Sequence, residues 1–318
     1  MRKVMLIKII ALICIFSSIF LQVNKNFQGK EKQLRIPNLV FPVLSDVHIG
    51  GKQADKKFIK ALQDCGSLEN KYDAIAFVGD ITDTGNVRQY KYFSSILSRE
   101  FSKGAKRFIA IGNHEYKAEK TNEAMIVKRF VHETAMPSLY YDNWVKGYHF
   151  IVLGSENMGE AKLSNAQLNW LEEKLKEKVD ENGSRPIFVF LHQPIPHTVY
   201  GSDTWGNIIN YGQLDEILKK FPQVILFSGH SHYSFNSPKT MFKDNFTMFN
   251  TGAVYYIMGE DDKYTDYKIS QGLIVQVYDE KVEVRPREFT NRKWIGKGYT
   301  IDLKTKEKGL SPLKNPID

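Results

Sequence analysis

Five short segments of the sequence place Asp, Asn or His side chains where a metal ion could bind. They are Asp46-Val-His48, Gly79-Asp80-Ile-Thr-Asp83, Gly112-Asn113-His114-Glu115, a lone His192, and Gly229-His230-Ser-His232. Carboxylate, amide and imidazole groups form a mixed oxygen and nitrogen donor set. Such a set suits Mn, Fe, Co or Zn better than Mg or Ca, which prefer oxygen ligands alone. The residue types therefore predict chemistry that depends on a transition metal.

Two of the segments share one spacing, since Asp46 and His48 are separated by one residue, as are His230 and His232. In an extended segment, side chains two positions apart point to the same side, so each pair is expected to reach a single ion. One segment alone is a weak signal, because Gly-Asp and Gly-Asn pairs are ordinary turn sequences. The succession of all five segments is what predicts a metal site.

Each motif directly follows a short apolar run that is typical of a buried β-strand. Strands are expected at 39–44, 74–78, 107–111, 148–153, 186–191 and 224–227, and helices at 54–68, 87–101 and 166–179. This alternation predicts an α/β fold, and strand-like runs at 254–258, 272–277 and 281–284 predict a second sheet. Because the functional crevice of an α/β sheet lies outside the carboxyl ends of its strands, the five motifs are expected to converge.

The order of the motifs resembles the calcineurin-like metallophosphoesterase superfamily over roughly residues 39–257. The resemblance implies a four-layer α/β/β/α sandwich, here expected at 37–290, with a dinuclear metal site at the carboxyl ends of the strands. One ion would be bound by Asp46, His48, Asp80 and His232. The other would be bound by Asp80, Asn113, His192 and His230, with Asp80 bridging the two ions.

The resemblance also implies a reaction, the hydrolysis of a small phosphate ester by water that the two ions activate. Two cations about 3.5–4 Å apart can hold both the attacking and the departing oxygen of such a displacement. In the family the histidine at the position of His114 is not a ligand. It faces the phosphate, where it stabilises charge or protonates the leaving oxygen. Asp83 is expected to orient that imidazole.

Departures from family patterns narrow the class of enzyme. Thr84 stands where calcineurin-like phosphoprotein phosphatases carry a phosphate-binding arginine, and Asp83 stands where purple acid phosphatases carry a tyrosine ligand. The chain also has no room for the large C-terminal domain of secreted nucleotidases. Compact phosphodiesterase-like members, including those that act on cyclic nucleotides or glycerophosphodiesters, match best. A phosphomonoesterase with the same site, and a non-catalytic metal-binding protein of the same fold, are the alternatives.

Charge and composition favour a globular protein that does not bind nucleic acid. The 318 residues are 42% hydrophobic and 25% charged, with a net charge of +8. Arg2, Lys3, Lys8 and Lys25 supply four of these charges, and the first 25 residues contain no acidic residue. The remaining charge, +8 − 4 = +4, is scattered, whereas an exported nuclease would need a basic groove.

The N-terminus has the pattern of an export signal. Arg2, Lys3 and Lys8 precede an apolar run from Ile9 to Val23. Residues 1–24 are therefore expected to be a signal peptide or an N-terminal membrane anchor, with membrane contact through residues 4–23. No small-x-small cleavage site follows the run, so the choice between cleavage and retention stays open. Residues 25–36 are expected to form a linker, and 291–318 a basic C-terminal tail.

The remaining candidates have weaker support. His132 and His149 are expected to be structural, and His197, five residues after His192, could reach a substrate. The aromatic residues of the 198–211 loop could stack on a base, although packing within the loop is favoured; they are Tyr200, Trp205 and Tyr211. Cys65 is expected to be buried. With Cys14 as the only other cysteine, the exported domain has no internal disulfide.

Overall fold

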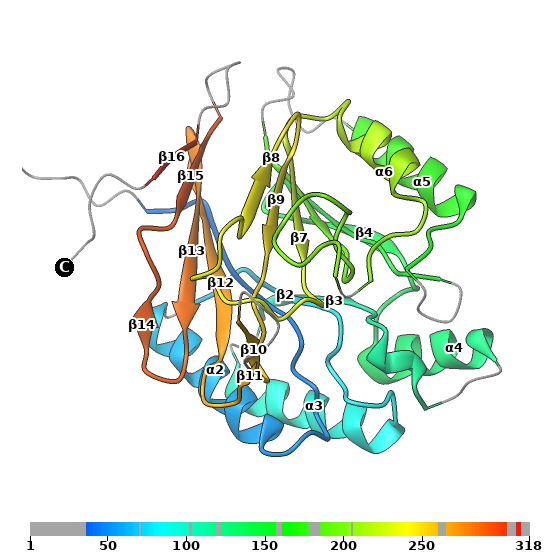
Figure 1. Ribbon diagram of the computed structural model, residues 1–318, viewed down its shortest axis with the longest axis vertical. Helices are drawn as coiled ribbons and strands as arrows, with labels where there is room; N and C mark the ends of the chain where they lie inside the picture. Colours follow the sequence, from blue (N-terminus) through cyan, green and yellow to red (C-terminus); the bar gives the residue numbers. More distant parts are fainter. Residues whose placement is uncertain are drawn as a thin grey trace, which may run out of the picture. The chain divides into compact units, whose positions relative to one another are not determined.

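Two β-sheets pack face to face and helices cover their outer faces in the computed structural model (Figure 1). The structure describes residues 36–69, 71–101, 104–118, 122–156, 161–177, 185–204, 206–259, 265–303 and 310–312. Residues from Pro37 onward form one compact unit. The predicted α/β/β/α sandwich is confirmed.

The first sheet combines parallel strands with antiparallel ones. Its strands are β1 (Leu39–Leu44), β2 (Ala74–Val78), β3 (Lys106–Ala110), β12 (Gln271–Val277), β13 (Lys281–Glu288), β14 (Lys293–Trp294), β15 (Tyr299–Asp302) and β16 (Leu310–Pro312). The order is β16-β15-β13-β12-β1-β2-β3, with β14 paired to β13. Strands β1, β2 and β3 run parallel to one another, so their carboxyl ends lie at one edge of the sheet.

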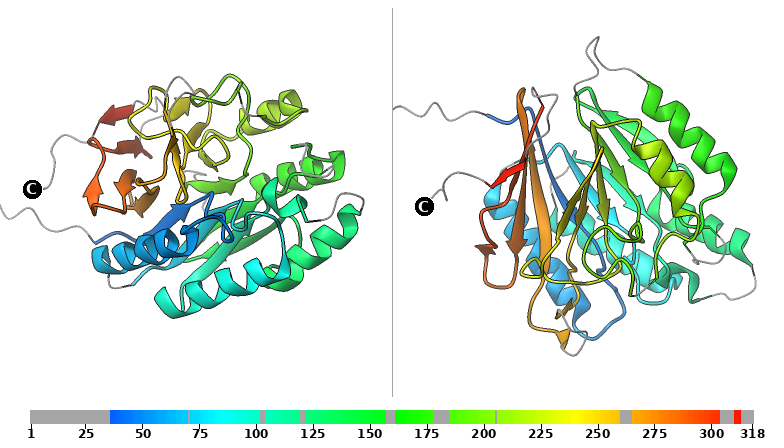
Figure 2. Two further views of the ribbon diagram at one scale, coloured as in Figure 1. Left: turned by 60° about the horizontal axis from the view of Figure 1, so that its bottom comes forward. Right: turned by 45° about the horizontal axis from the view of Figure 1, so that its top comes forward.

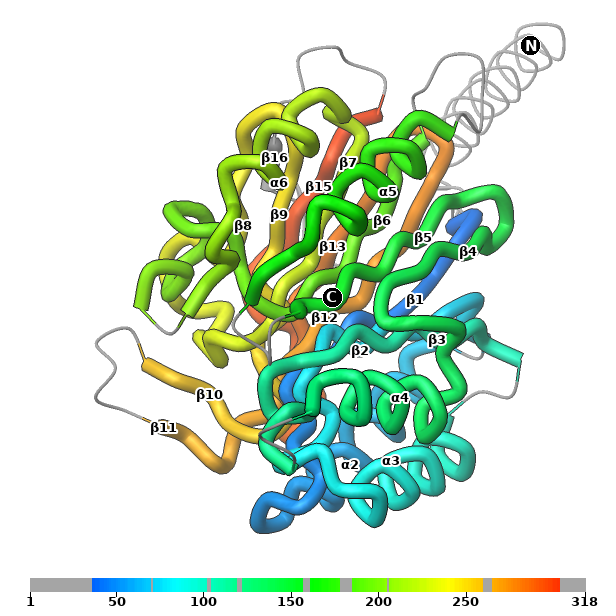
Figure 3. The backbone as a smooth tube through the Cα atoms, turned by 90° about the vertical axis from the view of Figure 1, so that its right-hand side faces the viewer, coloured from blue at the N-terminus to red at the C-terminus, as the bar shows by residue number. Residues whose placement is uncertain are grey.

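The second sheet is built in a similar way. Its strands are β4 (Tyr141–Val145), β5 (Tyr148–Val152), β6 (Ile187–Phe190), β7 (Val224–Ser228), β8 (Met241–Lys243) and β9 (Thr247–Asn250). The order is β4-β5-β6-β7-β9-β8, in which β5, β6, β7 and β9 are parallel. A separate two-stranded hairpin joins β10 (Ile257–Met258) to β11 (Thr265–Asp266), and Figure 3 shows it standing apart from both sheets.

Helices complete the outer layers, as Figure 2 shows. Those against the first sheet are α2 (Ala54–Leu68), α3 (Val87–Glu100) and α4 (Glu123–Thr134); those against the second are α5 (Asn165–Lys176) and α6 (Tyr211–Leu218). A short 3-10 turn, η1 (His114–Tyr116), follows β3. Asn86, Asn122 and Ser164 cap α3, α4 and α5 by accepting backbone N–H bonds.

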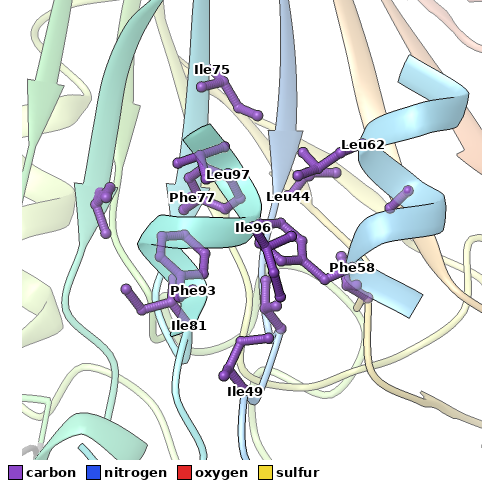
Figure 4. Close-up of a cluster of buried hydrophobic side chains, with 14 of the residues drawn as sticks. Leu44, Ile49, Phe58, Leu62, Ile75, Phe77, Ile81, Phe93, Ile96 and Leu97 are labelled. Carbon is purple, nitrogen blue, oxygen red and sulfur yellow. The ribbon is translucent and has the colours of Figure 1, made fainter. Parts of the chain in front are cut away.

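Alternation along the strands divides the core between two interfaces. On β1, Leu39, Phe41 and Val43 pack between the sheets, whereas Val40 and Leu44 pack against the helices. The helix-facing cluster in Figure 4 includes Phe58 of α2, Phe93 of α3 and Phe77 of β2. Both faces of β1 and β2 are therefore buried, which explains why these strands read as continuous apolar runs.

Several elements differ from the sequence-based expectations. The strand expected at 254–258 is reduced to Ile257–Met258, because the N–H groups of Val254 and Tyr255 bond instead to the carbonyls of Ser45 and Asp46. Helices α4 and α6 and strand β4 were not predicted.

The first sheet continues past residue 290, where a basic tail was expected to begin. Strand β14 pairs with β13, and so does β15, in a register that places Ile301 opposite Val282. Ile301 is buried in the core between the sheets. The folded domain therefore extends at least to Asp302, and the boundary at 290 is corrected.

The predicted signal or anchor at 1–24 lies outside the described residues, as does all but the last residue of the predicted linker. Within the described ranges, no helix has both the length and the apolar character of a membrane span. Export remains a prediction, which fractionation of cells expressing the full chain would test. A cytoplasmic location of that chain would contradict it.

A buried ion pair joins helix α2 to strand β13. Nε and Nη2 of Arg287 donate to the two carboxylate oxygens of Asp64 at 2.7 and 2.9 Å. The side chains are 6% and 0% exposed, and the Arg287 guanidinium lies 4.8 Å from the centre of the Trp294 ring. Arg287 therefore connects strand β13 to helix α2 through Asp64 and to strand β14 through Trp294.

We predict that Asp64→Ala lowers the free energy of unfolding by about 3–5 kcal/mol, because it leaves the Arg287 guanidinium buried without its partner. Chemical denaturation followed by circular dichroism measures the change. Asp64→Leu combined with Arg287→Met removes both charges and is expected to recover much of the loss. Asp215→Ala, which breaks the exposed pair with Lys219, is the control and should change stability far less. Equal effects of Asp64→Ala and Asp215→Ala would refute the proposed importance of burial.

Candidate metal centre

The five motifs converge where the carboxyl ends of β1, β2 and β3 meet those of β6 and β7. Backbone bonds join neighbouring loops, including Asp46 N–H to the Gly79 carbonyl at 3.1 Å and Gly229 N–H to the His192 carbonyl at 3.0 Å. A side-chain bond joins the two sheets, since Nδ1 of His192 donates to the Val78 carbonyl at 2.7 Å. The predicted convergence of the motifs is therefore observed.

Asp46, His48 and His232 form the first group of donor atoms, all within 4.8 Å of one another. Nε2 of His232 lies 3.1 Å from Oδ1 of Asp46 and 3.2 Å from Nε2 of His48. All three residues are buried. Their facing nitrogen and oxygen atoms can hold one cation.

Asp80, His192 and His230 form a second group with the same spacing. Nε2 of His192 lies 3.3 Å from Oδ2 of Asp80 and 3.1 Å from Oδ1 of Asn113. The same Asp80 oxygen lies 3.8 Å from Nε2 of His48, which belongs to the first group. Asp80 thus stands between the two groups, where one carboxylate can serve two ions.

The backbone at these positions is not extended, so the geometry assumed for the Asp-x-His and His-x-His pairs is wrong. Positive φ angles occur at five of the seven predicted ligands, namely Asp46 (53°), His48 (50°), Asp80 (49°), His230 (70°) and His232 (56°). A non-glycine residue rarely adopts this conformation, and such strain costs about 1–3 kcal/mol per residue. Sharp turns at the strand ends, rather than extended segments, aim these side chains at the centre.

Gly79 is required by close packing as well as by its φ of +81°. A Cβ atom at this position would lie 2.4 Å from Nδ1 of His192. The absence of a side chain therefore lets His192 approach β2 and donate to the Val78 carbonyl.

Hydrogen bonds from Nδ1 to backbone carbonyl groups orient two of the imidazoles. Nδ1 of His192 donates to Val78, and Nδ1 of His232 donates to the Tyr256 carbonyl at 3.1 Å. In each ring this leaves Nε2 facing the carboxylates. Such outer contacts commonly fix the tautomer and direction of a metal-binding histidine.

The electrostatics of the cluster favour a bound cation. Burial raises the pKa of Asp46, but the facing His232 outweighs it, and the net effect lowers the pKa to about 2. Burial lowers the pKa of His192, but the charge of Asp80 outweighs it and raises the pKa to about 10. Oδ1 of Asp46 is buried without a hydrogen-bond partner among the described residues, which leaves a lone pair for a ligand bond. The residues therefore fit a dinuclear metal site.

His114 and Asp83 lie beside the second carboxylate. Nδ1 of His114 donates to the backbone carbonyl of Asp83 at 2.8 Å, and its Nε2 lies 3.9 Å from Oδ2 of Asp80. The Asp83 carboxylate lies 3.5 Å from Nδ1 of His114 and 3.6 Å from Nδ1 of His48. The Asp83 carboxylate thus lies near both imidazoles, whereas the hydrogen bond that holds His114 comes from the Asp83 main chain. An orienting role of the Asp83 carboxylate stays a prediction.

Glu115 is a site residue whose role the sequence did not reveal. Its buried carboxylate accepts bonds from the N–H groups of Asp80 (3.0 Å), Thr82 (2.9 Å) and Gly112 (2.7 Å), and from the Thr82 hydroxyl (2.8 Å). Burial and the neighbouring Asp80 raise the pKa of Glu115 to about 8. One side chain thus joins the loops that follow β2 and β3.

Lys117 was also missed, because a lysine beyond the motif has no local signal. Its Nζ lies 2.6 Å from Nε2 and 2.9 Å from Nδ1 of His114. Burial and the nearby positive charge of Lys117 both lower the pKa of His114. The exposed ammonium group therefore sits over the imidazole that is expected to face the phosphate.

The other histidines lie away from the two groups. His132 is exposed, while buried His149 bonds to Asp142 at 2.8 Å and stacks on Trp144. His149 and Asp142 could form a metal group with Glu177, but Nζ of Lys174 already lies 3.3 Å from Asp142 and 2.8 Å from Glu177.

In the 198–211 loop, Tyr200 packs edge-on against Tyr233, and His197 pairs with Asp203 at 3.1 Å. The contact of Tyr200 is a packing interaction of the kind favoured for this loop, whereas Tyr211 is 38% exposed. Trp205 lies outside the described residues.

A four-layer sandwich with clustered Asp and His donors at its strand ends defines the metallophosphoesterase class. Residues 40–234 match the family model of the calcineurin-like phosphoesterases, and the chain belongs to this family.

The proteins similar to the chain include two curated phosphodiesterase relatives and a solved purple acid phosphatase structure. The chain is 25% identical over 214 residues to the cAMP/cGMP dual specificity phosphodiesterase of Mycobacterium tuberculosis, a match that covers 63% of this chain and 64% of that protein. It is also 30% identical over 204 residues to a probable glycerophosphodiester phosphodiesterase of Arcobacter nitrofigilis. This match covers 59% of this chain and 70% of that protein. A purple acid phosphatase from yellow lupin seeds shares the fold, with a TM-score of 0.57 and 12% identity. The match covers 81% of this chain and 53% of the phosphatase chain.

We predict that Glu115→Gln lowers the free energy of unfolding by about 1–3 kcal/mol, because one of the two oxygens, each of which accepts two hydrogen bonds, would be replaced by an amide NH₂ group that faces N–H donors. Metal content should fall as well, since Asp80 and Asn113 lie on the loops that Glu115 joins. Thermal denaturation and elemental analysis measure the two effects. Glu216→Gln is the matched control, because Glu216 is an exposed residue of α6. A Glu115→Gln protein with normal stability and normal metal content would contradict the proposed role.

Proposed function

We propose that this protein hydrolyses phosphodiesters with two metal ions. The observation that carries the proposal is the pair of neighbouring donor groups, between which Asp80 stands within 3.3 Å of His192 and 3.8 Å of His48. One ion would be held by Asp46, His48, Asp80 and His232. The other would be held by Asp80, Asn113, His192 and His230.

The donor set supports Mn, Fe, Co or Zn as the bound ions, because four imidazoles accompany only two carboxylates and one amide. When bound, such a pair activates water and stabilises the charge on phosphorus. The protein contributes a rigid, largely buried cluster in which His192 and His232 are already oriented by carbonyl groups.

His114 and Lys117 supply the groups that meet the phosphate. With Nδ1 bonded to the Asp83 carbonyl, Nε2 of His114 is the nitrogen that faces Asp80 and the site. Lys117 provides a positive charge near a phosphate oxygen, on a flexible side chain. His114 assists the leaving group, and Asp83 holds both His114 and His48 in place.

Two observations support a diester over a monoester substrate. Thr84 replaces the arginine that could bind a dianionic phosphate through two parallel hydrogen bonds. Both relatives described above carry phosphodiesterase names, one for cyclic nucleotides and one for glycerophosphodiesters.

We predict that metal-free protein is inactive and that Mn, Co or Zn restores hydrolysis. Purified protein is treated with a chelator, dialysed, reconstituted with each metal, and assayed with bis(p-nitrophenyl) phosphate and p-nitrophenyl phosphate. The bis ester is expected to be hydrolysed faster. Full turnover after verified metal removal would refute the two-metal proposal, and faster hydrolysis of the monoester would refute the diester preference alone.

Three substitutions separate catalysis from metal binding. His114→Asn is expected to retain both ions while kcat falls by about 10²–10⁴-fold, because a group acting on the leaving oxygen is lost. His230→Asn should lose occupancy of one ion, and Asp83→Asn should keep both ions with a smaller loss of kcat. Elemental analysis beside kcat for each variant provides the measurement. Loss of one metal equivalent in His114→Asn would instead identify His114 as a ligand.

A further inference from the structure

Three tyrosines lie in mutual contact beside the first metal group. The Tyr256 ring lies 4.1 Å from the His232 ring, and the Tyr255 ring lies 5.5 Å from the His48 ring. Tyr267 contacts both tyrosines, at 5.2 Å from Tyr256 and 5.6 Å from Tyr255. These residues form an aromatic wall, Tyr255–Tyr256–Tyr267, that leads outward from the predicted metal ligands.

Backbone hydrogen bonds fix the wall to the metal centre. Tyr255 N–H donates to the Asp46 carbonyl at 3.0 Å, and Met258 N–H donates to the His232 carbonyl at 2.8 Å. The Tyr256 carbonyl in turn accepts from Nδ1 of His232. The position of the wall relative to the cluster is therefore set by the same residues that would hold the metal.

The wall borders a cavity of about 470 Å³, lined by Lys52, Gln53, Lys57, Tyr255 and Tyr267. Lys57 is an anchor in this cavity, because its Nζ donates to the carbonyls of Tyr255 and Ile269. It thereby holds the chain on both sides of the β10–β11 hairpin. Lys52 and Gln53 are exposed and place polar groups at the rim.

Tyr267 is the member of the wall most open to solvent, with 57% of its surface exposed. A tyrosine that served only to pack the hairpin would bury most of its ring. An exposed aromatic face that lines a cavity, one ring removed from the predicted ligands His48 and His232, is instead suited to stacking on a flat ring.

We propose that the cavity binds the organic group of the phosphate ester, and that this group carries a flat aromatic ring with polar edges, such as a nucleobase. The ring stacks on Tyr267 and Tyr255, and Lys52 and Gln53 reach its edge or the attached sugar. The proposal rests on the proposed function, since it places the phosphate at the metal centre. It gives the tyrosines a role in substrate selection that differs from metal binding and from acid–base catalysis.

A binding experiment tests the pocket without turnover. Metal-reconstituted full-length protein is titrated in a calorimeter with adenosine 5′-monophosphate and with ribose 5-phosphate, which differ only by the base. The nucleotide should bind more tightly to the unaltered protein. Tyr267→Leu, which keeps apolar bulk but removes the aromatic face, should weaken nucleotide binding about 5- to 100-fold and leave ribose 5-phosphate within twofold. Tyr267→Phe should bind as the unaltered protein does.

Tyr92→Leu is the matched control, because Tyr92 is a 45% exposed tyrosine on α3 that does not line the cavity. Equal affinity of the unaltered protein for the two ligands would overturn the proposal. So would an equal loss for both ligands in Tyr267→Leu. If the reconstituted protein hydrolyses no phosphate ester yet discriminates the nucleotide through Tyr267, the proposed function fails while the pocket assignment stands.

Discussion

Two buried carboxylates set the constraint on which the rest of the site depends. Asp46 and Asp80 end the first two strands of one sheet and are almost completely buried. A buried carboxylate is costly unless it is paired. The imidazoles that face them, His232 and His192, come from the other sheet. Charge balance at the strand ends and the packing of the two sheets are therefore coupled, at a place where the donor atoms could also hold metal ions.

The same constraint explains the strained backbone. An extended strand end would direct alternate side chains to opposite faces, whereas the cluster needs donors from several strands aimed at one point. Positive φ angles achieve this, and the surrounding hydrogen bonds maintain them. His48 N–H bonds to the Asp80 carbonyl, and the Glu115 carboxylate holds the Asp80 loop against Gly112. Strain at the centre is thus offset by bonds between neighbouring loops.

Much of the fold was predictable, because strands that are buried on both faces read as apolar runs and the motifs follow them directly. The rest depends on contacts that no local pattern records. Helix α4 buries only Ile126, Phe130 and Thr134 and leaves the apolar Met125 exposed, so its apolar residues do not mark one face clearly. Strand β15 is mostly half-buried and follows a glycine-rich, charged segment, so it resembles a tail. Likewise the motifs predicted that these Asp and His side chains would cluster, but not the turn geometry that brings them together.

The residues proposed to contact the ester are placed by different means from the residues predicted to bind metal. Metal donors must match the charge and geometry of an ion, so their types can be read from the sequence. Lys117 directly follows the 3-10 turn that carries His114, whereas Tyr267 lies far from every motif and reaches the aromatic wall only in the folded chain. Tyr255 depends on backbone bonds to Asp46, more than 200 residues earlier in the chain. One metal centre can therefore serve different phosphate esters, since the groups around it can change without disturbing the ions.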